Sequence, residues 1–266
     1  MADSPSAEKL PFVRRERDER GVVRLTLARP QSFNALSEGM LAALQGELDA
    51  VAIDERTRVV VIAAEGKAFC AGHDLKEMRA EPSQAYYEAL FAQCARVMLT
   101  IQRLPVPVVA RVQGIATAAG CQLVAACDLA VAASGARFAV SGVNLGLFCS
   151  SPSVALSRNL QRKAAFEMLV TGEFISAEEA KARGLINRVA SAEALDAEVE
   201  SLVAAIVAKP RVAIAMGKDL FYRQLEVGVE AAYDDAGRTM ACNMMDATAL
   251  EGVQAFIDKR KPGWAG

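Results

Sequence analysis

Residues 59–75 read VVVIAAEGKAFCAGHDL, and residues 108–123 read VVARVQGIATAAGCQL. Each stretch opens with an apolar, mostly β-branched run, which predicts a strand buried inside the fold. Each run then leads into a turn built from glycine and other small residues. Buried strands that end in such turns are typical of α/β proteins, because the turn leads the chain into a helix that covers the sheet.

The segments on both sides repeat this order of strand, turn and helix, so we predict an α/β protein. Residues 12–17 and 22–27 flank a glycine turn and predict a hairpin, and Ser37 is placed to cap a helix. Ser176 and Glu179 form a predicted capping box. The remaining expected elements are a helix over 86–103, a strand over 108–112, a turn over 114–119, a short helix over 120–127, strands over 129–132 and 137–140, and helices over 195–208 and 212–240, within a region from Pro152 onward that is almost entirely helical.

The composition is that of an ordinary globular chain. The 266 residues include 30 basic and 32 acidic ones, a net charge of −2, and 53% are hydrophobic. High apolar content with low net charge excludes a mainly disordered chain, and the lack of a basic excess argues against a nucleic-acid binder. The length suits one large domain with an appendage, which we place as a core over residues 12–200 and a helical oligomerisation region over residues 201–266.

No targeting or membrane-spanning segment is recognisable. The first residues lack a basic stretch followed by an apolar one, so no signal peptide is expected, and residues 1–11 are expected to be frayed. Residues 138–157 carry no charge, but five serines, Asn144 and Pro152 make them unsuitable for spanning a bilayer. We therefore expect a cytoplasmic protein.

The sequence contains no recognisable motif for a zinc site, a serine hydrolase or a nucleotide-dependent enzyme. Its six cysteines form no CxxC pair, and His73 is the only histidine, so no common zinc pattern can be built. We expect the cysteines to be small buried hydrophobes that stay reduced. A serine hydrolase needs a histidine between nucleophile and acid, yet no GxSxG elbow accompanies His73. GxGxxG and the phosphate-binding loop are also absent, which argues against nucleotide-dependent enzymes.

The turns at residues 69–73 and 114–120 have two interpretations. Their small residues can simply allow close packing of strand and helix. Alternatively, they let two backbone N–H groups approach one oxygen, and the helix that starts near Gly120 adds its positive end. Two donors about 2.7–3.1 Å from an oxygen would stabilise an enolate or a tetrahedral oxyanion. The residue types alone leave both interpretations open.

Residues 69–78, FCAGHDLKEM, and residues 114–123, GIATAAGCQL, resemble the two signature segments of the enoyl-CoA hydratase/isomerase (crotonase) family. The resemblance keeps the family's order and extends over almost the whole chain from residue 12. Residues 144–149 and Trp264 further resemble one subgroup of the family. The other matching segments are 27–30, 34–36, 171–172, 175–177, Ala180, 184–185 and 255–262.

This resemblance implies a fold and a ligand. The implied fold is a crotonase-like spiral of ββα units with a helical C-terminal extension, assembled into trimers or into hexamers of two trimers. The implied ligand is a coenzyme A thioester, with no metal, no covalently bound cofactor, no nucleic acid and no membrane as partner. Matched residue by residue, the backbone N–H groups of His73 and Ala119 would form the oxyanion hole, whereas the His73 ring has no role in the family motif. The matched coenzyme A contacts are Arg29, Ala71, Asp74, Leu75, Lys76 and Gly120, with Lys76 toward a phosphate, and Phe256 and Lys259 toward the adenine, in some members from a neighbouring subunit.

The chain departs from the family at both catalytic carboxylates. Hydratases of the family use two glutamates to hold water and move protons, whereas these positions are Gln122 and Gly142 here. An amide accepts no proton near neutral pH and glycine offers no side chain, so hydration is expected to be weak. The space at Gly142 is hypothesised to admit a water or a small anion. Cys149 and Ser150 are candidate nucleophiles, although the sequence offers neither of them an evident base or cation.

The sequence therefore predicts an acyl-CoA-binding enzyme of the enoyl-CoA hydratase/isomerase type, a lyase by resemblance, whose reaction is altered. Two alternatives stay open: a non-catalytic acyl-CoA-binding or assembly protein, and a thioester hydrolase or decarboxylase. The apolar positions of the helical tail, among them Val203, Ile206, Ile214 and Leu220, exceed what a lone extension needs and favour self-association.

Overall fold

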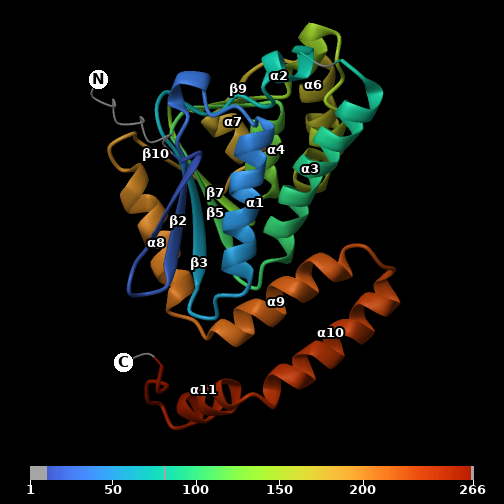
Figure 1. The fold of residues 1–266 in the computed structure, drawn as a ribbon. Helices are drawn as coiled ribbons and strands as arrows, with labels where there is room; N and C mark the ends of the chain where they lie inside the picture. Colours follow the sequence, from blue (N-terminus) through green and yellow to red (C-terminus); the bar gives the residue numbers. More distant parts are fainter. Residues whose placement is uncertain (1–10, 81, 265–266) are drawn as a thin grey trace, which may run out of the picture.

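The computed structural model describes residues 11–80 and 82–264, which are organised by two sheets (Figure 1). The larger sheet has the strand order β1-β2-β3-β5-β7-β10. β1 (Val13–Arg17) and β2 (Val22–Leu27) pair antiparallel as the predicted hairpin, and the pairs from β2 to β10 are parallel. Every residue of β3 (Val59–Ala64) is buried, as its continuous apolar sequence predicts. The other strands are β5 (Val108–Val112), β7 (Leu129–Ala133) and β10 (Arg188–Ala190).

The smaller sheet has the strand order β4-β6-β8-β9. β4 (Ala68–Cys70), β6 (Ile115–Thr117) and β8 (Arg137–Ala139) run parallel, and β9 (Ile175–Ser176) pairs antiparallel with β8. From β3 to α5 the chain repeats one order three times, giving one strand to the larger sheet, the next strand to the smaller sheet, and then a helical segment. This repeat winds the core as a spiral of ββα units.

Helices cover both faces of the larger sheet. α1 (Glu38–Ala52) begins after Ser37, whose side chain accepts a hydrogen bond from Met40 N, and it packs against α3 (Gln84–Arg103). α4 (Ala119–Ala126) is buried along its whole length. α8 (Leu195–Val207) covers the opposite face, where it meets alternate residues of β3, β5 and β7 (Figure 1). The shorter helices of the core are α2 (Leu75–Ala80), α5 (Ser150–Asn159), α6 (Arg162–Thr171) and α7 (Ala177–Ala182).

Three C-terminal helices extend from the end of the core that lies opposite α2 (Figure 1). They are α9 (Arg211–Gln224), α10 (Val229–Met244) and α11 (Ala247–Ile257). Lys218 of α9 anchors them, because its ammonium donates to Asp128 Oδ2 (2.6 Å) and to two carbonyl oxygens of the core (2.8 and 2.9 Å). Tyr222 donates to the same carboxylate at 2.7 Å. Burial raises the pKa of Asp128 and lowers the pKa of Lys218, while their ion pair opposes both shifts.

The three C-terminal helices carry much exposed apolar surface. Phe256 is 85% exposed and Tyr233 is 78% exposed. Apolar surface of this kind marks an interaction site when it is contiguous. Val203, which was expected to contribute, instead packs from α8 against the larger sheet at 1% exposure, so the exposed set differs from the predicted one. The exposed apolar residues of α9–α11 include Phe221, Val229, Met240, Met244, Leu250, Val253 and Ile257.

Most expected elements are confirmed within one or two residues, and so is the capping box at Ser176. Two expectations are wrong. Segments expected as turns contain β4 and β6, and the helix expected over 212–240 is broken between α9 and α10. The region after Pro152 is almost entirely helical as expected, although it also contains the short strands β9 and β10. The missed strands have only two or three residues, too few for an alternating pattern to emerge. The expected fraying concerned residues 1–11, of which residues 1–10 lie outside the described residues.

No helix within the described ranges is long and apolar enough to cross a bilayer. Five cysteines are buried free thiols, as predicted, and Cys242 is an exposed one. Burial raises the pKa of Cys70, Cys94 and Cys121 to about 12, so these thiols behave as small apolar groups.

Candidate active site

The two small-residue turns lie side by side because their strands are neighbours. β4 pairs in parallel with β6, with Ala68 opposite Ile115 and Cys70 opposite Ala116. Both strands run in the same direction, so the turns that follow them leave from the same edge of the smaller sheet. The turn after β4 carries His73, and the turn after β6 carries Ala119, the first residue of α4.

Glycines allow these turns to touch. A Cβ atom on Gly72 would lie 2.9 Å from Ala118 Cβ and 3.2 Å from Ala119 N, and a Cβ on Gly120 would lie 2.1 Å from Cys70 O. Gly72 has a φ of +89°, a conformation that other residues rarely adopt. Ala118 also has a positive φ, +50°, without being glycine. Strained backbone of this kind is retained where the surrounding structure holds it, most often at functional sites.

The two backbone N–H groups point toward the shared space. Gly72 O accepts a hydrogen bond from Leu36 N at 2.7 Å, on the side of the segment away from β6. In a trans peptide the C=O and N–H point in opposite directions, so the N–H of His73 points toward the turn after β6. The Ala119 N–H likewise points out of the helix, because Ala118 O accepts from Gln122 N within α4. Neither N–H donates to any group in the described part of the chain.

The His73 ring is held beside this pair. Its Nδ1 atom lies 3.3 Å from Leu36 O, and its ring centre lies 5.5 Å from that of Phe91 on α3. Burial lowers the pKa of His73, and the contact with the Leu36 carbonyl opposes that shift. The imidazole is therefore neutral near pH 7, and the ring is hydrogen-bonded locally, as the sequence allowed.

Gln122 lies one turn into α4 and is 4% exposed. Its Oε1 atom is buried without a hydrogen-bond partner among the described residues. An unpaired buried carbonyl is costly, so this atom is suited to accept a hydrogen bond from a bound molecule. The hydroxyls of Thr117, at the end of β6, and Ser141, just after β8, form a hydrogen bond of 2.9 Å.

Gly142, which the family resemblance matches to the second carboxylate position, has its Cβ direction filled by the chain itself. A Cβ atom on Gly142 would lie 2.4 Å from Leu147 O and 2.8 Å from Cys149 Sγ. The loop is closed by hydrogen bonds from Leu147 N to Gly142 O (3.0 Å) and from Gly142 N to Cys149 Sγ (3.3 Å). The space hypothesised for a water or a small anion is therefore absent along the Cβ direction of Gly142, and that hypothesis is wrong.

Neither candidate nucleophile has an activating partner among residues 11–80 and 82–264. Cys149 is 7% exposed, and burial raises the pKa of its thiol, the opposite of what a thiolate nucleophile needs. Ser150 Oγ donates to Phe148 O at 3.4 Å, and the chain's only histidine lies at position 73. The geometry gives no support to either residue as a nucleophile.

The predicted coenzyme A contacts lie in different parts of the molecule. Ala71, Asp74, Leu75 and Lys76 lie at the turn after β4, where Asp74 accepts from Lys76 N (2.8 Å) at the start of α2. The Arg29 guanidinium makes local contacts, since it donates a hydrogen bond to Pro11 O (2.8 Å) and lies over the Phe12 ring. Phe256 and Lys259 lie at the end of α11 and just beyond it, at the opposite end of the molecule from α2 (Figure 1). The structure therefore does not bring these two residues to the turns of the same chain.

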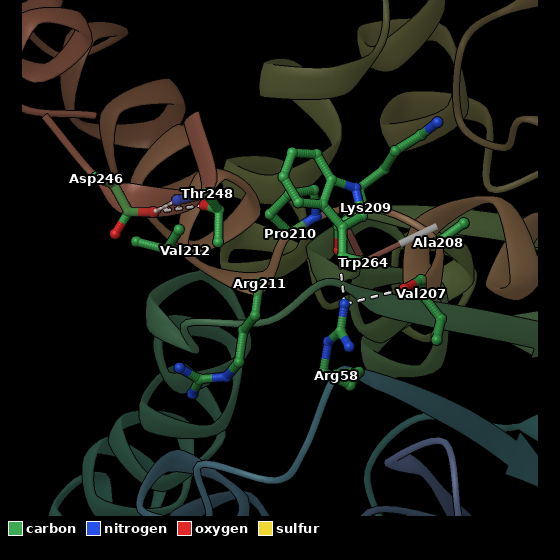
Figure 2. Close-up of a pocket in the computed structure, with 10 residues that line it drawn as sticks. All are labelled: Arg58, Val207, Ala208, Lys209, Pro210, Arg211, Val212, Asp246, Thr248 and Trp264. Carbon is green, nitrogen blue, oxygen red and sulfur yellow. Dashed lines mark hydrogen bonds between the residues drawn. The ribbon is translucent and has the colours of Figure 1, made fainter. Parts of the chain in front are cut away.

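A cavity of about 370 Å³ lies far from these turns, where the start of β3 meets α8, α9 and α11 (Figure 2). Arg58 donates there to Val207 O (2.9 Å) and Lys209 O (2.6 Å), at the end of α8. Asp246 accepts from Thr248 N (2.8 Å) and caps α11. These polar groups satisfy helix ends, and no sequence pattern marks them because the contacts join distant segments. Within residues 11–80 and 82–264, no group of His, Cys, Asp and Glu can hold a metal ion.

Comparison with known proteins places this geometry in context. Residues 17–266 match the family model described as enoyl-CoA hydratase/isomerase. The mitochondrial enoyl-CoA hydratase domain-containing protein 3 of Mus musculus is 44% identical, over 99% of this chain and 88% of the relative. The Xenopus laevis protein of the same name is 46% identical, over 92% of this chain and 84% of the relative. This name is that of the subgroup which residues 144–149 and Trp264 resemble.

Solved structures agree with the fold. An enoyl-CoA hydratase of Mycobacterium smegmatis matches with a TM-score of 0.95 and 70% identity, over 96% of this chain and all of that chain. Human enoyl coenzyme A hydratase domain-containing protein 3 matches with a TM-score of 0.92 and 43% identity, over 95% of this chain and all of that chain. The predicted α/β spiral with its C-terminal helices is therefore confirmed.

Proposed function

The chain belongs to the enoyl-CoA hydratase/isomerase family, and from this premise we propose that it binds an acyl-CoA thioester and polarises the thioester carbonyl. The donors are the backbone N–H groups of His73 and Ala119. The observation that carries the proposal is the orientation of these two groups, which point into one space and have no acceptor in the described chain. The start of α4 adds its positive dipole end at the same point.

The reaction differs from standard hydration. Gln122 keeps the shape of a glutamate but cannot take a proton near neutral pH, and Gly142 provides no side chain. General acid–base help is usually worth about 10²–10⁴-fold, so we expect water addition to be weakened by about that factor. Gln122 instead offers its unpaired Oε1 as a hydrogen-bond acceptor to a polar group of the ligand.

A non-catalytic acyl-CoA-binding protein is the second candidate. One observation favours it: the loop over residues 142–149 occupies the position of the second carboxylate with its own backbone. A chain that only binds thioesters needs no side chain there, whereas the N–H pair would still hold the carbonyl oxygen.

We also propose a trimer, or a hexamer of two trimers. Phe256 and Lys259 lie away from the turns of their own chain, so they reach a thioester only in an assembly. The apolar surface of α9–α11 gives such an assembly a surface to bury. A cytoplasmic location stays a prediction from the sequence, while the vertebrate relatives carry the word mitochondrial in their names.

Calorimetric titration with acyl-CoA thioesters of increasing chain length tests the binding, and incubation with crotonyl-CoA tests hydration. We expect binding of at least one thioester and hydration far below that of a good hydratase. Ala119→Pro removes one N–H at the first position of α4, where helices tolerate proline. This variant should lose thioester affinity but keep affinity for coenzyme A, whereas Ala119→Gly, which retains the N–H, should bind both.

Two results would overturn the proposal. The first is an absence of binding to every thioester of the series. The second is equal thioester affinity in Ala119→Pro and Ala119→Gly, because the carbonyl would then not rest on the N–H group. Light scattering tests the assembly, and a monomer at micromolar concentration would contradict it.

A further inference from the structure

We infer that Asn34 is a positioning residue of the proposed site. Its side chain holds the loop that fixes the peptide between Gly72 and His73, and so aims the His73 N–H at the thioester carbonyl. The inference rests on the proposed function, since it needs the His73 N–H to be a donor to the ligand. Asn34 is fully buried, so it acts through this loop and not on the ligand itself.

The Asn34 side chain joins the loop over residues 29–36 to the segment that leads into β4. Its Nδ2 donates to Glu65 O (2.8 Å) and to Ala68 O (2.9 Å), and its Oδ1 accepts from Arg29 N (2.9 Å). Both amide hydrogens and the amide oxygen are therefore paired. A buried polar group with all its partners in place makes its surroundings rigid, because any movement of the loop breaks one of these hydrogen bonds.

The same loop holds the turn after β4 by two backbone hydrogen bonds, one on either side of Asn34 in the sequence. Phe33 O accepts from Ala71 N (3.1 Å), and Leu36 N donates to Gly72 O (2.7 Å). Phe33 and Asn34 both have a positive φ, +51° and +53°, a backbone that residues other than glycine keep only where the surroundings hold it. The hydrogen bonds of the Asn34 side chain therefore hold a strained loop, and that loop holds the turn.

The hydrogen bond to Gly72 O decides where the next N–H points. The C=O and N–H of one trans peptide point in opposite directions, so Leu36 N on one side of the segment leaves the His73 N–H on the other. Gly72 lacks a Cβ atom and has a φ of +89°, so this peptide can rotate readily once Leu36 N is withdrawn. A rotated peptide would turn a carbonyl oxygen toward the ligand oxygen, where the proposed site needs a donor.

Two variants separate this role from general support of β4. Asn34→Gly removes the three side-chain hydrogen bonds and keeps a residue that adopts a φ of +53° without strain. Gln113→Met is the matched control, because Gln113 Nε2 donates to Gly66 O and Ala68 O (both 3.1 Å). The control therefore loses two hydrogen bonds to the same segment, but none that ties this segment to the loop over residues 29–36 in the described chain.

The experiment records the carbon-13 NMR resonance of butyryl-CoA and octanoyl-CoA labelled at the carbonyl carbon. Hydrogen bonds to the carbonyl oxygen draw electrons from that carbon, so its resonance should move downfield when the thioester binds the intact protein. Asn34→Gly should lose more than half of this shift, and its ratio of thioester to coenzyme A affinity should fall by about 2- to 10-fold, the usual worth of one hydrogen bond. Gln113→Met should keep both the shift and the ratio, and urea unfolding measures what each variant loses in stability.

A full carbonyl shift in Asn34→Gly would overturn the inference. An equal loss of the shift in Gln113→Met would also contradict it, because any loosening of β4 would then be sufficient. An Asn34→Gly chain that fails to fold where Gln113→Met folds would show that Asn34 supports the whole fold and not this turn. Failure of the proposed function is seen in the intact protein, which would then bind neither thioester or bind them without a carbonyl shift.

Discussion

Restoring the two glutamates of a standard hydratase should not restore hydration in this chain. We predict that Gln122→Glu alone raises the rate of water addition to crotonyl-CoA, and that adding Gly142→Glu removes the gain. The two positions differ in the room that they offer. Gln122 already has the length of glutamate, and its Oε1 has no partner to lose among the described residues.

The magnitude at position 142 follows from the distances. A Cβ on Gly142 would meet Leu147 O at 2.4 Å, although real Cβ atoms essentially never approach closer than 3.0 Å. The carbonyl would have to retreat by about 0.6 Å, yet the hydrogen bond from Leu147 N to Gly142 O closes this loop. Overpacking of this kind costs about 1–3 kcal/mol. One restored carboxylate at position 122 is worth about 10²-fold, the lower end of the usual contribution.

The assay compares hydration rates and urea unfolding of the single and double variants. Gln122→Met, which keeps the volume without a carboxylate, controls for packing at position 122. Gly135→Ala controls for glycine replacement, because a Cβ on Gly135 meets nothing within 4 Å. A double variant that hydrates at least about 10-fold faster than Gln122→Glu, with unchanged stability, would refute the reasoning.

Three further predictions concern other parts of the molecule. Lys218→Met should lower the free energy of unfolding by about 3–5 kcal/mol in urea titration, because it leaves the Asp128 carboxylate buried without its cation; a loss below 1 kcal/mol would contradict the anchoring of α9. Gly72→Ala should cost about 1–3 kcal/mol and abolish thioester binding in calorimetry, since φ is +89° and the new Cβ would crowd Ala119 N; normal binding would place the site elsewhere. Because the folded pKa of His73 is lowered, the unfolded chain takes up this proton first as the pH falls, so unfolding free energy should drop between pH 7.5 and 5.5, and His73→Asn should lose less over that interval.

Local sequence predicted the two small-residue turns, whereas the assignment of the His73 and Ala119 N–H groups came from the family resemblance. The pairing of β4 with β6, which brings the turns at Gly72 and Ala119 side by side, is seen only in the structure, because both strands have three residues and lie in segments that were expected as turns. The filled space at Gly142 was not predictable, because it depends on how residues 143–149 fold back on it. The position of Phe256 could not be predicted either. Apolar periodicity indicates that a segment is helical and which face is apolar, but not where α11 lies relative to the core.

Backbone hydrogen-bond donors and acid–base side chains respond differently to amino-acid replacement. Backbone N–H groups survive every side-chain replacement except proline, so the pair at His73 and Ala119 depends only on the turns that hold it. Acid–base chemistry resides in side chains, and we propose that Gln122 and Gly142 stand at the positions where hydratases of the family have glutamates. A site of this kind still stabilises an enolate, but it needs a proton acceptor from elsewhere.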